Sequence, residues 1–160
     1  MSTTEDAPNQ FTYQPDTTPT SIRATFRVYH PELDPNGLSE RFDLKPSVAW
    51  RRNDDEYGWR KRPGHKAPSG GWLLSSRLAV KSNDAIGHVD WLLDQLSGRA
   101  GLIKQLQGEG YMIDVVVGWH AASWNTTPAL TPTIMRRLAN FNLPIWFDVY
   151  LYEGEGDPEA

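Results

Sequence analysis

The segment Ile22-Arg23-Ala24-Thr25-Phe26-Arg27-Val28-Tyr29-His30 decides the fold, because a similar segment recurs near the other end of the chain. Its apolar and polar residues alternate, as in a strand with one buried face. The segment from Tyr111 to Trp119 alternates in the same way and ends in His120. Each copy then continues through a loop and a short amphipathic stretch to a proline, Pro46 or Pro144. Since neither copy can bury its apolar face alone, we expect the two copies to share one core.

Both copies also contain the same signal for the start of a helix. Asp34 precedes Pro35, and Thr131 precedes Pro132. A capping side chain followed by proline is typical of a first helical turn. We therefore expect a short helix after each of these positions.

The stretch between the copies predicts a hairpin and a long helix. Residues 47–52 and 71–80 have strand-like composition and enclose a long loop. Residues 84–107 follow a helical apolar period. This helix would be about 36 Å long against about 27 Å for an eight-residue strand, so we expect a break at Gly98 and Gly101. Residues 145–152 predict the final strand, with Ile145, Phe147, Val149 and Leu151 directed inward.

These elements predict an α+β fold with the order β-α-β-β-α-β-α-β. We expect duplicated β-α-β units in a ferredoxin-like arrangement, with a mainly antiparallel sheet and helices on one face. Residues 21–153 form the expected single domain. Residues 1–20 and the acidic residues 154–160 show no apolar period, so we interpret them as disordered tails.

Composition excludes several classes of protein. The 160 residues contain no cysteine, which excludes a disulfide framework and a thiol nucleophile. Neither a secretory signal nor a membrane-spanning run is present, and we expect a cytoplasmic protein with no membrane association. The net charge of −4 makes duplex nucleic acid an improbable partner, because cationic contacts to phosphate dominate that affinity.

A basic, aromatic loop at residues 50–72 is one candidate binding site. Arginine side chains grip phosphate or carboxylate groups while aromatic faces stack on bases. This composition suits an anionic ligand, single-stranded nucleic acid or an acidic protein. The alternative is a solvated hairpin tip whose charge is offset by Asp54, Asp55 and Glu56. The candidate residues are Arg51, Arg52, Trp59, Arg60 and Arg62.

The outward face of the sheet is the other candidate. If the first strand lay between the two strands of the second copy, Arg27 would stand between Asp114 and Asp148 among aromatic residues. Tyrosine, tryptophan and arginine dominate the energetics of protein interfaces, so this face suits a protein partner. The alternative is ordinary cross-strand ion pairing on a wet surface. The candidate residues are Arg27, Tyr29, Asp114, Trp146, Asp148 and Tyr150.

Catalytic and metal sites find little support in the sequence. A carboxylate beside an arginine stays ionised and is a poor general acid. His30 and His120 end equivalent strands, and antiparallel strands would separate them, so we expect no metal site. The serines lack a neighbouring base or nucleophile-elbow glycines. We therefore expect no catalytic residues and no cofactor.

Six short motifs follow one another between Ala24 and Tyr150. They are Ala24-Thr25-Phe26-Arg27-Val28-Tyr29, Leu33-Asp34-Pro35, Pro46-Ser47-Val48-Ala49-Trp50, Gly70-Gly71-Trp72, Gly118-Trp119 and Phe147-Asp148-Val149-Tyr150. In this order they resemble a bacterial family known only as domain of unknown function 4279. The resemblance implies a compact intracellular domain and supplies no catalytic residues. Residues 51–65 depart from the family pattern, which has a shorter turn, so no role can be carried over to that loop.

The leading functional hypothesis is a non-catalytic protein-interaction domain, in particular an immunity-type inhibitor of a bacterial toxin. One alternative is a sensor of a small anionic ligand or of single-stranded nucleic acid, acting through residues 50–72. A small enzyme is the third and least supported alternative, because no catalytic constellation is present.

Overall fold

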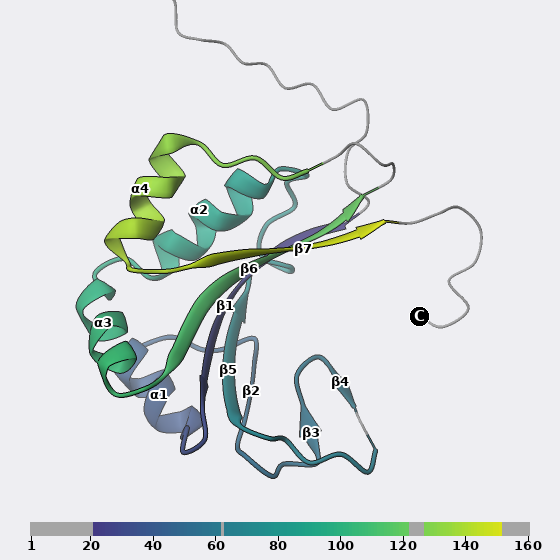
Figure 1. Ribbon diagram of the computed structural model, residues 1–160, viewed down its shortest axis with the longest axis vertical. Coiled ribbons are helices and arrows are strands. Elements are labelled where there is room, and N and C mark those ends of the chain that lie inside the picture. The colour runs from purple at the N-terminus through teal and green to yellow at the C-terminus, as the bar shows by residue number, and fades with distance from the viewer. Residues whose placement is uncertain (1–20, 62, 122–126, 152–160) are drawn as a thin grey trace, which may run out of the picture.

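The computed structural model describes residues 21–61, 63–121 and 127–151, and it shows a five-stranded sheet with its helices on one face (Figure 1). Both expected tails lie outside the described residues, as do Arg62 and Tyr152 and the side chains of Arg60 and Lys61. The α+β class and the helical cover of one face are confirmed. We call the face that bears the helices the helix-side face and the opposite one the open face.

The sheet has the strand order β2-β5-β1-β6-β7. Its neighbouring strands are antiparallel except β6 and β7, which are parallel, so the prediction of a mainly antiparallel sheet is confirmed. β3 and β4 form a separate small hairpin in the chain segment that connects β2 to β5. The strand bounds are β1 Ser21–His30, β2 Val48–Trp50, β3 Glu56–Tyr57, β4 Arg60–Lys61, β5 Gly70–Ser75, β6 Met112–Ala121 and β7 Ile145–Leu151.

The helices begin where the capping signals predict. Asp34 caps α1 (Pro35–Phe42) by accepting a hydrogen bond from the Gly37 amide, with a distance of 3.3 Å. Thr131 caps α4 (Pro132–Asn140) by accepting from the Ile134 amide at 3.4 Å. In both helices proline occupies the first turn, where its missing N–H costs nothing. Within the described residues, no helix has the length and apolar character needed to cross a bilayer.

The long helical stretch is divided in two as expected, but the break lies at Gly98 and not at Gly101, which is inside the second helix. α2 (Ala85–Gln95) and α3 (Ala100–Gly108) are separated by a turn in which Gly98 has a φ of +76°. This left-handed conformation costs a side-chain-bearing residue about 1–2 kcal/mol, whereas glycine adopts it freely. Gly98 therefore lets the chain change direction and place α3 beside β6.

An aromatic group anchors the core between the sheet and α1. Trp72 is fully buried and packs edge-on against Phe26, with ring centroids 6.2 Å apart. Its other neighbour, Phe42 at the end of α1, stacks on it at 5.3 Å. The indole N–H of Trp72 donates to the Ser39 hydroxyl at 2.9 Å, so the buried polar atom is satisfied. Ile22, Ala24, Phe26 and Val28 of β1 all lie in this core, as the alternation predicts.

The two copies do not place their second strands in the same way. In the first copy, β5 lies between β1 and β2. In the second copy, β7 lies directly beside β6 and parallel to it. The interpretation in which β1 separates β6 from β7 is therefore wrong, because β6 separates β1 from β7.

The prediction that Phe147, Val149 and Leu151 point into the core is also wrong. These side chains lie on the helix-side face but remain 41%, 44% and 43% exposed. The physical reason is the position of the helical layer, since α2 packs on β1 and α4 packs on α2. The cover is centred over β1, so much of the edge strand β7 extends beyond it (Figure 1).

Candidate functional site

The centre of the open face holds an ion pair between β1 and β6. Arg27 and Asp114 stand directly opposite each other, and two hydrogen bonds of 2.7 and 2.8 Å join the guanidinium to the carboxylate. The hydrogen bond to Asp114 is the main reason that the pKa of Arg27 lies above its ordinary value, and burial opposes it. The Arg27 guanidinium also lies over the Tyr29 ring, 5.8 Å from its centroid. The predicted association of Arg27, Tyr29 and Asp114 is thus present.

Asp148 does not join this ion pair as the sequence interpretation proposed. Its register partner on β6 is Gly118, which faces Arg23 on β1 rather than Arg27. The Arg23 side chain lies over Gly118, since a Cβ at Gly118 would be 3.5 Å from Arg23 Cγ. Arg23 therefore extends toward β7 across a position that has no side chain. The reason for the error is the strand order, because β7 is two strands away from β1.

The β7 end of the open face presents two large aromatic side chains. Trp146 is 58% exposed and Tyr150 is 48% exposed. Tyr150 stacks on His120 of β6, with ring centroids 4.7 Å apart and planes 17° from parallel. Burial, with a smaller contribution from the Arg23 charge, holds the pKa of His120 below its ordinary value. Met112 on β6 is also exposed and apolar. The sequence did not identify it as a candidate, because the alternation of β6 shows only that Met112 points away from the core.

The other end of the open face is covered by the loop that contains β3 and β4. A second small core forms there around Trp50, Ala67 and Leu73, with Tyr29 and Tyr57 packed against it. Gly71 makes this packing possible, because a Cβ on it would come within 2.2 Å of the Trp50 ring. The Gly-Gly-Trp motif therefore has a structural reason. It lets an indole lie flat on the backbone of β5.

Three cations of the basic loop pair with acidic neighbours. Arg51 pairs with Asp34, which is also the cap of α1, and Arg52 pairs with Glu32 at 2.9 Å. Lys66 pairs with Asp55 within the loop. The backbone of Arg60 pairs with Tyr57 in the β3–β4 hairpin, and Arg62 lies outside the described residues. Trp59, at the hairpin turn, is 46% exposed.

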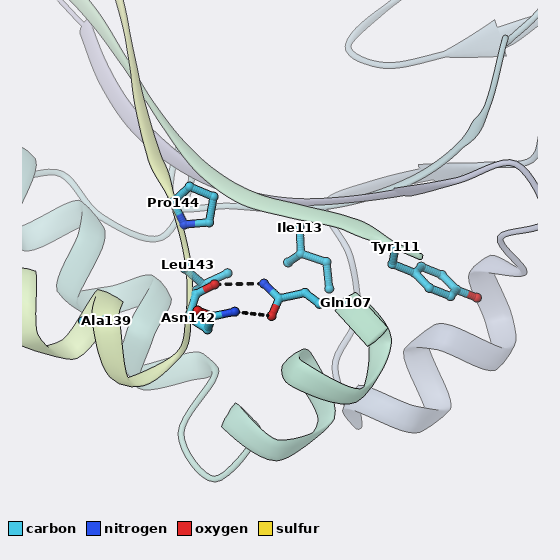
Figure 2. Close-up of a pocket in the computed structure, with 7 residues that line it drawn as sticks. All are labelled: Gln107, Tyr111, Ile113, Ala139, Asn142, Leu143 and Pro144. Atoms are coloured by element: carbon cyan, nitrogen blue, oxygen red, sulfur yellow. Dashed lines mark hydrogen bonds between the residues drawn. The ribbon is translucent and has the colours of Figure 1, made fainter. Parts of the chain in front are cut away.

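A shallow hollow lies between the end of α3 and the turn that follows α4 (Figure 2). Its volume is about 530 Å³. Gln107 and Asn142 face each other across it, and each amide N–H₂ donates at 2.8 Å, to the Asn142 carbonyl and to the Gln107 side-chain oxygen respectively. Tyr111, Ile113 and Pro144 line the rest. These two hydrogen bonds, one to a backbone carbonyl and one to a side-chain oxygen, join the end of α3 to the turn after α4.

Ser76 and His88 form a pair that the sequence interpretation did not find. The Ser76 hydroxyl lies 2.6 Å from His88 Nδ1 and accepts a hydrogen bond from the Ala24 amide at 2.9 Å. His88 Nε2 lies 2.7 Å from the Ser82 carbonyl, which requires the proton on Nε2. Both side chains are buried, so substrate has no access to them. The pair connects α2 to β1 through the Ala24 amide.

His30 and His120 are far apart. β1 and β6 are antiparallel, and His120 faces Ser21 while His30 lies at the opposite end of β1. His30 stacks on Tyr111 with ring centroids 4.3 Å apart. Residues 21–61, 63–121 and 127–151 contain no group of three or more potential metal ligands.

Comparison with known proteins identifies a family but no activity. Neither a curated protein nor a solved structure matches the chain. A family model described as "Domain of unknown function (DUF4279)" matches residues 20–152. This match spans both copies, the hairpin between them and every strand of the sheet. The chain therefore belongs to the DUF4279 family.

Proposed function

We propose that this protein is a non-catalytic interaction domain that binds a protein partner through the β6–β7 end of its open face. The observation that supports this proposal is the exposure of Trp146 and Tyr150 on β7. Trp146 is opposite Val116, two residues along β6 from the Arg27–Asp114 pair, and Tyr150 is opposite His120, further along the same strand. Aromatic residues and arginine contribute most of the binding energy at protein interfaces. Folding leaves these aromatics partly solvated, so a partner that covers them gains the free energy of burying their remaining apolar area.

A more specific form of the proposal is an immunity-type inhibitor of a bacterial toxin that acts in the cytoplasm. The small size and the net charge of −4 support it, because an acidic surface attracts a basic partner by electrostatic steering. This form predicts that a captured partner is a basic protein.

The architecture that presents this face is, in our proposal, ferredoxin-like with one addition. The elements β1, α1, β2, β5, the α2–α3 pair and β6 follow the order β-α-β-β-α-β, and their four strands lie in the order β2-β5-β1-β6. α4 and β7 then extend the sheet by one parallel strand. In this proposal, the extension supplies the exposed aromatics Trp146 and Tyr150.

The test is capture of partners from a lysate of the cells that produce the protein, with the full chain immobilised. Trp146→Ala combined with Tyr150→Ala should weaken the affinity of a captured protein by about thirtyfold or more, the effect of removing interface hot spots. The matched control is Met135→Ala, which removes a half-exposed apolar side chain from α4 on the other side of the sheet. A partner that binds the double variant as tightly as the wild type contradicts the proposal.

The exposed Trp59 favours a second function, recognition of an anionic ligand or single-stranded nucleic acid by the basic loop. In this case Arg51 and Arg52 must exchange their carboxylate partners, Asp34 and Glu32, for the ligand. The affinity for an oligonucleotide should then decrease as the salt concentration increases, and at any one salt concentration it should be lower for Arg52→Ala than for the wild type. Lys81→Ala serves as a control for a lost charge elsewhere, and equal losses in both variants would exclude a specific site.

A further inference from the structure

The outer edge of β7 exposes backbone groups that are available for pairing. The Val115 amide donates to the Pro144 carbonyl at 2.9 Å, which fixes the side of the strand that faces β6. Because successive residues of a strand point their N–H and C=O groups to alternate sides, the groups of Phe147, Val149 and Leu151 point away from the sheet. Within the described residues, β7 ends the strand order and no further strand pairs with this edge (Figure 1).

β7 also lacks the features that normally protect an edge strand. Proteins block such edges with short strands, lysine, proline or bulges. β7 has seven residues, and within Ile145–Leu151 it contains no lysine, proline or glycine and only one charge, Asp148. The opposite edge differs, since β2 has only three residues and follows Pro46. Both faces of β7 are apolar at the exposed edge, with Trp146 and Tyr150 on one and Phe147 and Val149 on the other.

We propose that β7 pairs antiparallel with β7 of a second copy of this chain, around a two-fold axis at Val149. An isologous contact of this kind needs a surface that complements itself, and an edge strand with outward N–H and C=O groups meets that requirement. The two sheets would join into one ten-stranded sheet, with the helices of both copies on the same side. This inference does not depend on the proposed function of the open face.

The charge of Asp148 and the exposed side chains select the position of the axis. An axis at Asp148 would place two carboxylates directly opposite each other, which is destabilising. An axis at Phe147 would pair Leu151 with Leu143 of the second copy, which is already buried in the turn after α4. An axis at Val149 pairs Phe147 with Leu151, so that the three exposed apolar side chains of the helix-side face cover one another. It also places Asp148 opposite Tyr150, whose hydroxyl can donate to the carboxylate.

The first experiment measures the oligomeric state of the full chain by analytical ultracentrifugation over a concentration series. We expect a reversible dimer. Val149→Lys places two like charges at the axis and should raise the dissociation constant by about a hundredfold or more, because opposed like charges cost several kcal/mol. Leu78→Lys is the matched control, since Leu78 is 93% exposed in the turn after β5 and should leave the dimer intact. Circular dichroism of both variants verifies that each is folded.

The second experiment uses the absence of cysteine from the chain to test the register. In Val149→Cys the two thiols would lie opposite each other, with Cα atoms about 5.5 Å apart, inside the range of a disulfide. In Phe147→Cys they would be about 14 Å apart, four residues out of register, and should not link. Mild oxidation should therefore produce a covalent dimer of V149C but not of F147C.

Three results would overturn the proposal. The first is a wild-type chain that stays monomeric throughout the concentration series. A monomer whose β7 edge pairs with an added peptide or with its own tail counts as the same result. The second is a dimer that persists unchanged in V149K, which would place the contact elsewhere. The third is a disulfide that forms more readily in F147C than in V149C, which would exclude an axis at Val149.

Discussion

At the scale of single residues, the open face satisfies its central charges internally. The guanidinium of Arg27 uses two of its donors on Asp114, and both side chains are more than 70% shielded from solvent. A partly buried bidentate pair contributes more to stability than a surface ion pair, because water screens it less. The charge at this position therefore stabilises the pairing of β1 with β6.

Asp114→Asn should lower the free energy of unfolding by about 1–2 kcal/mol, since Arg27 keeps a neutral partner but loses the charge-assisted bonds. Urea denaturation measures the change. The control is Asp55→Asn, which removes the carboxylate of the exposed Asp55–Lys66 pair and should cost less than about 0.5 kcal/mol. Equal losses in the two variants would show that the central pair has no special role.

His120 should make the stability of the protein depend on pH. Its pKa in the folded chain lies below the ordinary value of 6.5, because burial and the Arg23 charge disfavour the imidazolium. The unfolded chain therefore binds the proton more readily, and stability falls as the pH drops from 6.5 through the folded pKa. His120→Phe retains the stacking on Tyr150 and should reduce the loss of stability between pH 7.5 and pH 5. Denaturation curves at both pH values test this, and an unchanged difference would contradict it.

At the scale of elements, backbone conformation rather than side-chain contact determines where the helices end. No atom lies within 4 Å of a Cβ placed on Gly98, so the φ of +76° is the reason for glycine there. Gly101 has equally open surroundings but lies inside α3 with an ordinary φ. These two glycines are three residues apart, and we expect their replacement by alanine to change stability in opposite directions.

Gly98→Ala should destabilise the protein by about 1 kcal/mol, because alanine pays the full cost of the left-handed conformation. Gly101→Ala should stabilise it by about 0.5–1 kcal/mol, because alanine has the higher helix propensity and fewer unfolded conformations. Thermal and urea denaturation of both variants measure the difference. A similar change in the two would mean that the turn between α2 and α3 tolerates a side chain at Gly98.

At the scale of the whole molecule, the order of the strands sets a gradient of stability. β1 lies between β5 and β6 and beneath α2, whereas β3 and β4 form a two-stranded hairpin of two-residue strands. Backbone groups in the centre of the sheet open only when the core opens, while a peripheral hairpin can open alone.

Amide hydrogen exchange should therefore be slowest in β1 and much faster in the β3–β4 hairpin. The rates of β1 should follow the free energy of global unfolding, so Asp114→Asn should accelerate them by the factor that corresponds to its loss of stability. The rates of the hairpin should not change in that variant. Hairpin amides that exchange as slowly as those of β1 would contradict the gradient.

Local sequence signals predicted many features of the fold correctly. The alternation of β1 identified its buried face, the Asp34-Pro35 and Thr131-Pro132 pairs located two helix starts, and Gly98 located the break between α2 and α3. Each of these signals depends only on nearby residues in the chain. Steric clash in the backbone, helix capping and the alternation of side chains along a strand all act over a few residues. The grouping of Arg27, Tyr29 and Asp114 could be predicted because it depends only on which side chains of β1 and β6 share a face of the sheet.

Only the tertiary structure decided the features that depend on which elements are neighbours in space. Alternation shows that Phe147, Val149 and Leu151 share a face, but the packing of α2 on β1 and of α4 on α2 decides that this face of β7 stays exposed. The same holds for Asp148, which the strand order separates from Arg27, and for the Ser76–His88 pair. The burial of a side chain depends on packing between segments that are distant in the sequence, so the residues of a single strand cannot show which element covers it.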